Sequence, residues 1–329
     1  MSRLLSRFAV VLLPLLAVLP AGCGSSSSDS SKPATPATLL LDFAPNAVHS
    51  GTYLAHARGW DRDAGVDLTV RAPASGTDAV KLLRAGRADL AYLDIHDLAL
   101  ANAKGADLVG VMGLVQRPLA AVLAEPAVAR PRELEGRRAG VTGLPSDRAV
   151  LRSIVAGDGG NPDRVKETTI GFQAVPALLA GRVAGATGFW NAEGVALRAK
   201  RPGTRIFKVD DYGAPPYPEL VLAVTRKTLR ERPQLVRDTV AALRRGYEAT
   251  LADPAAALTA LVQGAPGVDR AAAARELAAV SPAFRPRGGG RVGTLDPAVL
   301  RAWARWEARF GIVRQPPDVQ AMFAPAVAR

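Results

Sequence analysis

Residues 39–53 read LLLDFAPNAVHSGTY, and this stretch decides the predicted fold because it combines a strand, a polar loop and a helix start. The leucines at 39–41 form a short apolar run, as expected for a strand covered on both faces. Polar and turn-forming residues fill positions 42–51, and no helix breaker interrupts residues 53–58. In open α/β sheets, ligands bind where strands end and the following helices begin. The stretch therefore predicts part of a binding site; the alternative is a buried strand followed by an ordinary capped helix.

The same residues carry a family resemblance. LDFAPNAVHSGTY resembles LDW-x-PN-x-x-H-x-G-x-Y, the opening segment of the NMT1/THI5-like substrate-binding proteins. These proteins are solute receptors of ABC importers for thiamine-precursor pyrimidines, with relatives for riboflavin and sulfonates. The resemblance implies a type II periplasmic-binding-protein fold, in which two α/β lobes enclose a ligand cleft. Phe43 stands where the family commonly has Trp, which alters any aromatic contact made there.

The start of the chain predicts export. Residues 1–22 contain two arginines and then an apolar run that is too short to span a bilayer, as in a secretory signal peptide. LPAGC at 19–23 looks like a bacterial lipobox, although Pro20 is unusual in one; the alternative is a plain secretory peptide. A lipid on Cys23 would anchor the protein to the membrane without a transmembrane helix. Residues 23–37, rich in Ser, Pro and Thr, predict a flexible tether.

Composition narrows the function classes. Cys23 is the only cysteine and the chain has three histidines, so no disulfide framework, cysteine metal cluster or cysteine nucleophile is expected. We predict no catalytic residues, no cofactor and no metal. The net charge is +12, but the arginines are scattered and no aromatic residues interleave a basic patch. Nucleic-acid binding is therefore not expected, and attraction to an anionic envelope surface is favoured.

The body of the chain alternates strands and helices, which indicates parallel βαβ units in an α/β fold. The first series predicts strands at 66–71, 88–93 and 108–115 and helices at 78–85, capped by Thr77, and 98–104. The second predicts strands at 138–142, 166–170 and 183–189 and helices at 148–156 and 173–179. An apolar run at 220–224 is interpreted as the strand that returns to the first lobe, before helices at 232–252, 255–263, 270–280 and 297–310. The predicted domains are 38–125 (first lobe), 126–219 (second lobe) and 220–329 (return and helical tail).

The two series contain a weak repeat. Ala-Val-x5-Gly-Arg occurs at 79–87 and again at 174–182, which places Asp94-Ile95-His96 opposite Phe189-Trp190-Asn191. Each half then delivers a polar cluster to the end of a strand, and two such ends would face each other across a cleft. Chance similarity between two alanine-rich units is the alternative.

Candidate ligand-binding residues come from these strand ends and from the resemblance. The loop at 140–147 resembles the family's GV-x-G-x-x-(S/T)D loop, and residues 190–193 resemble its W-x-x-E element, whose Trp and Glu face the cleft. The predicted set is Asp42, Phe43, Asn46, His49, Tyr53, Asp94, His96, Gly143, Ser146, Trp190, Asn191, Glu193 and Tyr212. The structural alternatives are local capping by Asn46, His49 and Ser146, and a Trp packed in the hinge between the lobes.

The charge of the predicted cleft mouth favours one ligand class. It contains Asp42, Asp94, Asp97, Glu193, Asp210 and Asp211 and few basic residues. Receptors for sulfonate, nitrate or phosphate should instead offer Arg, Lys or converging N–H groups. An acid-rich site with a flat aromatic face suits a heterocycle that donates N–H groups, such as an aminopyrimidine. The predicted protein is a monomeric receptor that delivers this small molecule to an ABC permease.

Alternatives to this function remain open at the level of sequence. They are a receptor for riboflavin or alkyl sulfonates, a cation site built from the acids, and a ligand-sensing or structural lipoprotein. An enzyme that synthesises the thiamine pyrimidine is disfavoured, because relatives of that kind use a cysteine-rich CCCFC segment that this chain lacks.

Overall fold

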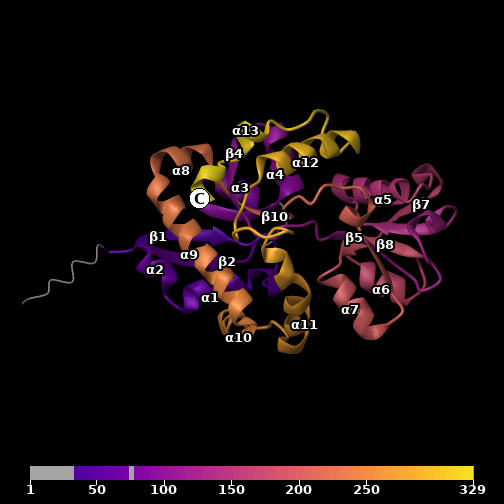
Figure 1. The fold of residues 1–329 in the computed structure, drawn as a ribbon, viewed down its shortest axis with the longest axis horizontal. Coiled ribbons are helices and arrows are strands. Elements are labelled where there is room, and N and C mark those ends of the chain that lie inside the picture. The colour runs from indigo at the N-terminus through magenta and orange to yellow at the C-terminus, as the bar shows by residue number, and fades with distance from the viewer. Residues whose placement is uncertain (1–32, 74–77, 329) are drawn as a thin grey trace, which may run out of the picture. The chain divides into compact units, whose positions relative to one another are not determined.

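The structure is a computed structural model that describes residues 33–73 and 78–328, which form two five-stranded sheets with covering helices (Figure 1). We call each sheet with its helices a lobe. The first sheet contains β1 (Thr35–Leu40), β2 (Val66–Arg71), β3 (Leu90–Asp94), β4 (Leu108–Gly113) and β10 (Leu220–Thr225). The second contains β5 (Ala120–Ala124), β6 (Arg138–Val141), β7 (Lys166–Thr169), β8 (Gly185–Phe189) and β9 (Arg205–Lys208). The predicted two-lobed α/β architecture is confirmed.

The first sheet has the strand order β2-β1-β3-β10-β4. β1 runs parallel to β2 and β3, whereas β10 runs antiparallel to β3 and β4. The prediction that residues 220–224 return to the first lobe is therefore correct. The predicted parallel pairing is confirmed for β1 with β2 and β3, whereas β10, for which the sequence predicted no direction, returns from the other lobe in the opposite direction.

The second sheet repeats this arrangement with the order β7-β6-β8-β5-β9. β5 is antiparallel to β8 and β9, so it holds the place that β10 holds in the first sheet. The repeated sequence forms α3 (Asp78–Arg84) before β3 and α6 (Ala174–Leu179) before β8. Gly86 and Gly181 follow these helices with φ of +66° and +64°, a conformation that glycine adopts at low cost. The short sequence repeat thus marks equivalent places in two similar sheets.

The chain crosses between the sheets twice, after β4 and after β9. Because β5 pairs in the second sheet, the first crossing lies before residue 120 and the predicted boundary at 125 falls one strand too late. At the crossings, the Ile95 amide donates to the Glu219 carbonyl and the Trp190 amide donates to the Leu119 carbonyl, each at 3.0 Å. These two bonds occupy equivalent positions in the repeat. Both crossing strands are therefore fixed at matching points of their sheets.

The family-like loop leads into a helix that packs very closely on the C-terminal helices. After β1 come η1 (Ala47–His49) and α1 (Ser50–Ala57), so the helix begins three residues before the predicted start at Tyr53. α1 packs on α9 (Pro233–Ala252) and α10 (Pro254–Gly264). A Cβ atom on Gly246 would lie 2.0 Å from the Gly51 carbonyl oxygen, and one on Gly51 would lie 2.5 Å from the Tyr247 ring. Gly51 of the family-like segment is thus required for helix packing.

The remaining helices cover the two sheets. They are α2 (Trp60–Asp63), α4 (Ile95–Ala103), α5 (Pro145–Gly157), α7 (Glu193–Lys200), α8 (Arg226–Glu231), α11 (Arg270–Val280), α12 (Pro297–Arg309) and α13 (Val319–Met322). Short 3₁₀ helices are η2 (Pro131–Leu134), η3 (Pro162–Arg164), η4 (Val209–Tyr212), η5 (Ser281–Phe284) and η6 (Pro325–Ala328). Neither α7 nor β9 was predicted. On α12, Trp303 and Trp306 are buried, as the apolar stripe of this helix predicts.

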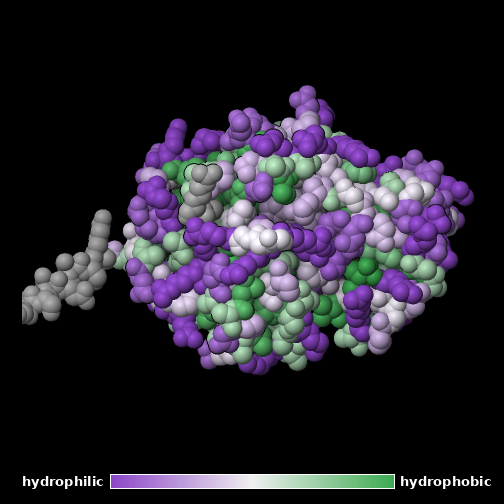
Figure 2. Space-filling view, viewed as in Figure 1, coloured by the Kyte–Doolittle hydropathy of each residue, from purple (hydrophilic) through white to green (hydrophobic). Residues whose placement is uncertain are grey.

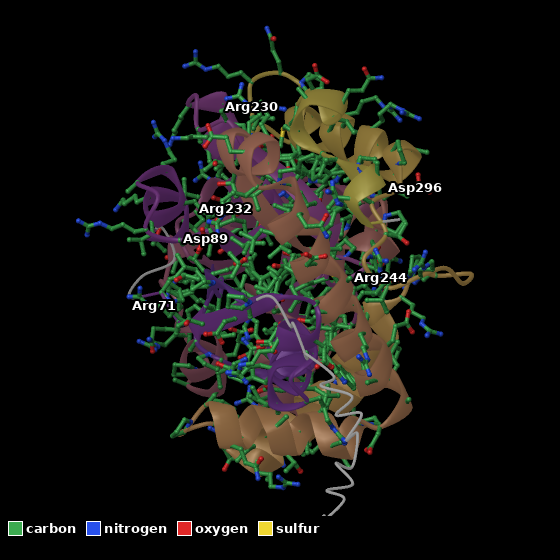
Figure 3. All side chains as sticks on the ribbon, turned by 90° about the vertical axis from the view of Figure 1, so that its left-hand side faces the viewer. Arg71, Asp89, Arg230, Arg232, Arg244 and Asp296 are labelled. Carbon is green, nitrogen blue, oxygen red and sulfur yellow. The ribbon has the colours of Figure 1, made fainter. Side chains whose placement is uncertain are left out.

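The surface carries charges of both signs. Figure 2 shows hydrophilic residues over much of the face seen in Figure 1. Many arginines pair with acids; Arg232, which precedes α9, forms an ion pair with Asp89, and Figure 3 shows the two side chains beside each other. In the described part of the chain, no helix is long and apolar enough to cross a membrane.

Some predictions fall on residues that the structure does not describe. The signal peptide at 1–22, the lipid site Cys23 and the Thr77 cap all lie outside the described residues. The predicted tether overlaps the described region at its end, where Thr35–Ala37 pair with Val66–Leu68 in the first sheet. The ordered strand therefore starts earlier than the leucine run alone indicates.

Candidate functional site

A cavity of about 110 Å³ lies between the two lobes, where β3 and β8 end. Strand ends from both sheets meet here, as the repeat predicts. Its lining includes four acids and several small or apolar residues: Asp94, His96, Ala120, Thr142, Leu144, Ser146, Asp147, Val150, Gly171, Phe172, Ala174, Thr187, Gly188, Phe189, Glu193 and Glu219. Among the described residues that line it, none is Lys or Arg. The cavity therefore has the acidic character that the sequence predicts.

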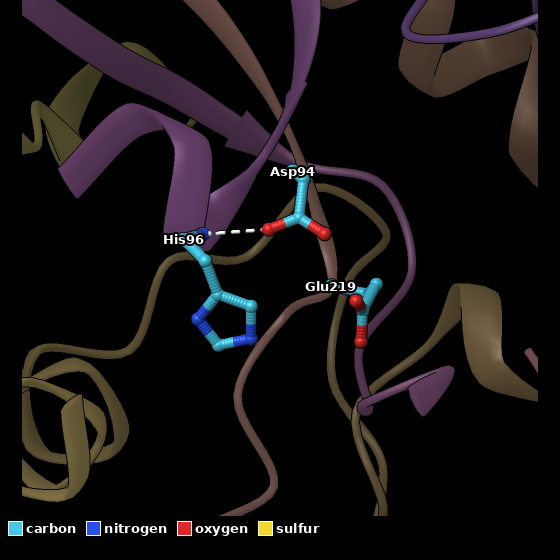
Figure 4. Close-up of side chains that lie close together, drawn as sticks. All are labelled: Asp94, His96 and Glu219. Atoms are coloured by element: carbon cyan, nitrogen blue, oxygen red, sulfur yellow. Dashed lines mark hydrogen bonds between the residues drawn. The ribbon is translucent and has the colours of Figure 1, made fainter. Parts of the chain in front are cut away.

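Asp94 and His96 form the first-lobe side of this cavity. Asp94 ends β3 and caps α4, and its Oδ1 accepts a 2.7 Å hydrogen bond from the His96 amide (Figure 4). This bond turns the chain sharply at the strand end, so the imidazole of His96 lies next to the Asp94 carboxylate. The sequence prediction that these two residues lie at the cleft agrees with this position.

His96 is 2% exposed and contacts two further buried groups. Its Nδ1 forms a hydrogen-bonded ion pair with the Glu307 carboxylate of α12, and its Nε2 lies 3.2 Å from the Tyr217 hydroxyl. Burial alone would lower the pKa of His96, but the charges of Glu307 and Asp94 raise it above its ordinary value. The ring is therefore an imidazolium at neutral pH that donates from both nitrogens.

Glu219 completes the first-lobe side and was not among the predicted site residues. It directly precedes β10 and is fully buried, and its Oε2 accepts a 2.6 Å hydrogen bond from the Leu119 amide of the other crossing strand. Its Oε1 has no hydrogen-bond partner among the described residues. Burial, and then the charge of Asp94, raise the pKa of Glu219. A buried carboxyl oxygen without a partner is costly for a protein and marks a place where a ligand group would be stabilising.

Glu193 is the corresponding acid on the second-lobe side. It begins α7, and its Oε2 accepts a 3.0 Å hydrogen bond from the Phe189 amide at the end of β8. Its own backbone amide also lies within hydrogen-bonding reach of the carboxylate. Burial raises the pKa of Glu193. Glu193 therefore caps the start of α7 and also lines the cavity.

Ser146 and Asp147 line the cavity from the start of α5. The Asp147 carboxylate accepts hydrogen bonds from the backbone amide of Thr142, at 3.0 Å, and from its hydroxyl. Asp147 therefore fixes the loop at 142–147, whereas the Ser146 hydroxyl forms no hydrogen bond with the described residues of that loop. Gly143 of the same loop has φ of +102° and lines a separate surface cavity. It is not in the lining of the cavity between the lobes, where a contact with the ligand was predicted.

Two exposed phenylalanines face each other from opposite lobes. Phe43, in the loop after β1, is 56% exposed, and Phe172, in the loop after β7, is 71% exposed. Their ring centroids are 6.4 Å apart with an interplanar angle of 39°. Phe172 lines the cavity and was not predicted. Together the two rings form a small exposed apolar surface beside the cavity.

Trp190 and Asn191 lie at the hinge, outside the cavity lining. Trp190 is 5% exposed, its Nε1 donates a 2.8 Å hydrogen bond to the Pro118 carbonyl, and the Lys208 ammonium lies 4.0 Å from its ring centroid. The indole is thus already covered on the crossing strand. This position agrees with the alternative of a Trp packed in the hinge between the lobes, because the indole N–H is already bonded there.

The polar residues of the first loop serve that loop itself. The Asp42 carboxylate accepts a 2.7 Å hydrogen bond from Nε2 of buried His49, whose Nδ1 accepts one from the Asn46 amide. The Asn46 side chain caps η1 by accepting from the Val48 amide. Asn46 and Tyr53 line a different cavity, of about 550 Å³, beside α10 and α11. These four side chains are therefore not brought to the cavity between the lobes.

The predicted ligand contact Tyr212 and the predicted mouth acids Asp210 and Asp211 also lie away from the cavity. Tyr212 packs edge-on against Phe207, with ring centroids 6.0 Å apart. Asp210 pairs with Arg117 at 2.8 Å, and Asp211 lies 3.7 Å from the same guanidinium. None of the three is in the cavity lining. Of the six acids predicted at the mouth, Asp94 and Glu193 line the cavity, joined by Asp147 and Glu219.

Comparison with known proteins gives this geometry a context. The family model described as "NMT1/THI5 like" matches residues 46–257. A formylaminopyrimidine-binding protein of Halalkalibacterium halodurans is 29% identical over 261 residues, covering 78% of this chain and 79% of that protein. The 4-amino-5-hydroxymethyl-2-methylpyrimidine phosphate synthase THI5 of Saccharomyces cerevisiae is 23% identical, covering 66% of this chain and 67% of that protein.

Solved structures share the fold. The periplasmic aliphatic sulphonate binding protein SsuA of Escherichia coli matches with a TM-score of 0.71 and 16% identity, covering 88% of this chain and 92% of that one. The alkanesulfonate-binding protein SsuA of Xanthomonas axonopodis pv. citri, bound to MOPS, matches with a TM-score of 0.67 and 19% identity, covering 89% and 99%. The predicted type II periplasmic-binding-protein fold is confirmed.

Proposed function

Because the chain belongs to the NMT1/THI5-like family, we propose that it is the solute-binding receptor of an ABC importer and binds a small aminopyrimidine-like heterocycle between its lobes. The similarity to a formylaminopyrimidine-binding protein along most of both chains supports the receptor role. Closure of the two lobes over the ligand would bury it, and binding would shift the population toward the closed state.

One observation carries the choice of ligand class: the lining of the cavity holds four acids and, among the described residues, no Lys or Arg. Carboxylates accept hydrogen bonds from amino and ring N–H groups, whereas a sulfonate would place its negative charge beside them. Glu193 and Asp147 bring two of these carboxylates from the second lobe. The protein shares its fold with the sulfonate receptors, but the acidic cavity favours a different class of ligand.

The size and the aromatic residues favour a single flat ring. The cavity between the lobes is small, with a volume of about 110 Å³. A single heterocycle matches this space better than the three fused rings of riboflavin. Phe172 and Phe43 stand beside the cavity and would stack on the faces of such a ring, taking the part that the resemblance assigned to Trp190.

A synthase function is the second candidate, because several curated relatives carry that name. The chain lacks the cysteine-rich CCCFC segment that the resemblance associates with synthesis, since Cys23 is its single cysteine. The buried ion pair of His96 with Glu307 also holds the one histidine of the cavity lining in place. Binding and release without chemistry is therefore the function that we propose.

The same proposal includes the place of the protein in the cell. The signal-peptide pattern and LPAGC motif support export and a lipid anchor on Cys23 at the outer face of the cytoplasmic membrane. The protein would act as a monomer that delivers its ligand to the permease subunits of the importer.

A thermal-shift panel tests the ligand class. Purified protein is heated alone and with aminopyrimidines, thiamine, riboflavin or aliphatic sulfonates. A ligand at about 100 times its Kd adds about 2.7 kcal/mol to stability. We expect a shift with aminopyrimidines that is lost in Glu193→Gln, while a shift with sulfonates alone would contradict the proposal. Formation of 4-amino-5-hydroxymethyl-2-methylpyrimidine phosphate, the product for which those relatives are named, without added pyrimidine would favour the synthase.

A further inference from the structure

Three potential metal ligands from two distant segments meet on the first-lobe side of the cavity. Asp94 and His96 come from the β3–α4 junction and Glu219 from the residue before β10. One ligand atom of each lies within 4.8 Å of those of the other two. Figure 4 shows the three side chains converging on a common space. The set combines one imidazole with two carboxylates, which is a donor set found in divalent metal sites.

A second observation points to a missing ligand at this place. Glu219 is fully buried, and its Oε1 has no hydrogen-bond partner in the described part of the chain, although Oε2 is bonded to the Leu119 amide. The surrounding protein therefore fixes this carboxylate firmly while leaving one of its oxygens unsatisfied. Unpaired buried carboxylate oxygens are rare, and a bound cation is one way of satisfying them.

The environment of His96 is also that of a metal ligand. Histidines that bind a metal through one ring nitrogen almost always donate the other N–H to a carboxylate, carbonyl or water, which fixes the ring orientation. In His96, Nδ1 is held by the buried carboxylate of Glu307, which comes from α12, more than 200 positions along the chain. Nε2 would bind a metal after releasing the proton that it carries in the metal-free protein, and its present neighbour is the Tyr217 hydroxyl at 3.2 Å.

We propose that Asp94, His96 and Glu219 bind one divalent transition-metal ion, such as Zn²⁺ or Mn²⁺, with Glu307 orienting His96. Three protein ligands leave at least one coordination position open, and all three residues line the cavity between the lobes. The open position would therefore face the space that receives the heterocycle, whose ring nitrogen is a suitable donor.

The geometry requires side-chain movement. Tetrahedral ligand atoms that are about 2.0 to 2.2 Å from one ion lie about 3.3 to 3.6 Å from each other. The present separations reach up to 4.8 Å, so the side chains would rotate until the widest separation has shortened by about 1.2 to 1.5 Å. The Tyr217 hydroxyl would give up its contact with Nε2 and become a neighbour of the ion.

Metal binding is measured directly, without the organic ligand. The full protein is stripped with EDTA, dialysed against Zn²⁺ or Mn²⁺, and its metal content is determined by mass spectrometry. Wild type should retain one ion per chain. Asp94→Asn and Glu219→Gln should weaken binding at least about 100-fold, and Glu307→Gln about 10- to 100-fold, the effect expected of an outer-shell partner. Asp94→Asn is informative because Asn also caps a helix, so α4 keeps its N-cap.

A matched control uses another histidine–carboxylate pair of the same lobe. His56 Nδ1 lies 2.7 Å from Asp61 Oδ2, away from the cavity. His56→Gln should retain the full metal content, and any fall in its melting temperature would come from the loss of the partner of buried Asp61 and not from loss of metal. Retention of metal by both Asp94→Asn and Glu219→Gln, or absence of metal from the wild type, would overturn the proposal. If the wild type holds no metal, a thermal shift by an organic ammonium ion alone would indicate that the acids bind organic cations instead.

The results distinguish failure of the metal site from failure of the proposed receptor function. A metal-free wild type that still gives a thermal shift with aminopyrimidines would remove the metal site and leave the receptor standing. A protein that binds one ion per chain but no heterocycle, with or without metal, would keep the site and remove the ligand assignment.

Discussion

The two lobes are built alike, but the residues at equivalent strand ends differ sharply in chemistry. In the first lobe, Asp94 and His96 end the strand in a buried charged cluster, while in the second Phe189 and Asn191 stand at the same positions of the repeat. The amides of Ile95 and Trp190 make equivalent hydrogen bonds to the two crossing strands. The repeat therefore determines where the site lies. Each lobe supplies two of the four acids of the cavity and one of the two exposed phenylalanines, but only the first adds a buried histidine.

The largest expected effect separates the two equivalent polar positions. Glu307→Ala leaves the buried imidazolium of His96 without its carboxylate, and breaking such a pair costs about 3 to 5 kcal/mol of unfolding free energy. Asn191→Ala at the equivalent place in the second lobe should cost about 1 kcal/mol or less, because the Asn191 Oδ1 is buried without a partner. Urea unfolding measures both. A loss in Glu307→Ala no larger than the small loss expected for Asn191→Ala would contradict the stabilising role of the charged cluster.

The next effect tests whether Trp190 belongs to the hinge or to the ligand. Trp190→Ala removes a buried indole and should cost about 3 kcal/mol or more of unfolding free energy. Phe43→Ala removes a ring that is more than half exposed and should change stability by about 0.5 kcal/mol or less. Thermal unfolding of the two variants without ligand gives the comparison. A stable Trp190→Ala protein would return this residue to the list of ligand contacts.

A smaller effect concerns binding through the aromatic pair. Stacking on one ring contributes about 0.5 to 1.5 kcal/mol, so Phe172→Ala and Phe43→Ala should each weaken pyrimidine binding by about 2- to 12-fold. Phe172→Leu, which keeps an apolar side chain without a flat face, should recover only part of the loss. Calorimetric titration provides these affinities, and unchanged Kd values in both alanine variants would exclude stacking.

The smallest predicted effect is the pH dependence contributed by Glu193. Burial raises its pKa in the free cleft, and an N–H-donating ligand binds only the ionised carboxylate. Acidification therefore protonates Glu193 and weakens binding by up to about tenfold per pH unit below the pKa, while binding is strongest above it. Glu193→Gln should bind weakly with a flatter pH profile. A profile that is identical in the two proteins would assign the pH dependence to another group.

The sequence predicted the architecture well because strand and helix periods are local signals. Strand β2 was predicted with the bounds that the structure has, and the run at 220–224 was correctly assigned to the first lobe. β5 was missed, since AAVLA follows the apolar run of β4 with few intervening turn residues. The antiparallel direction of β5 and β10 depends on the crossings between lobes, which no local pattern reports.

The site was only partly predictable, for a physical reason. Asp94 and Glu193 follow recognisable strand ends and were expected at the cleft. Glu219 precedes the apolar strand β10, and Glu307 lies within the apolar stripe of α12. An acid at either place ordinarily faces solvent. Only the tertiary fold buries them beside His96, and only it shows that Trp190 is covered while Phe172 is not. A signal for Glu219 existed, since it directly precedes a buried strand at a crossing point.

The most direct test is a calorimetric titration of wild type and Glu193→Gln with a formylaminopyrimidine and with an alkanesulfonate. We expect saturable binding of the pyrimidine to wild type, a loss of at least tenfold in Glu193→Gln, and no heat from the sulfonate in either protein. Tight sulfonate binding by wild type, unaffected or strengthened by Glu193→Gln, would contradict the claim that the acids of this cavity select its ligand.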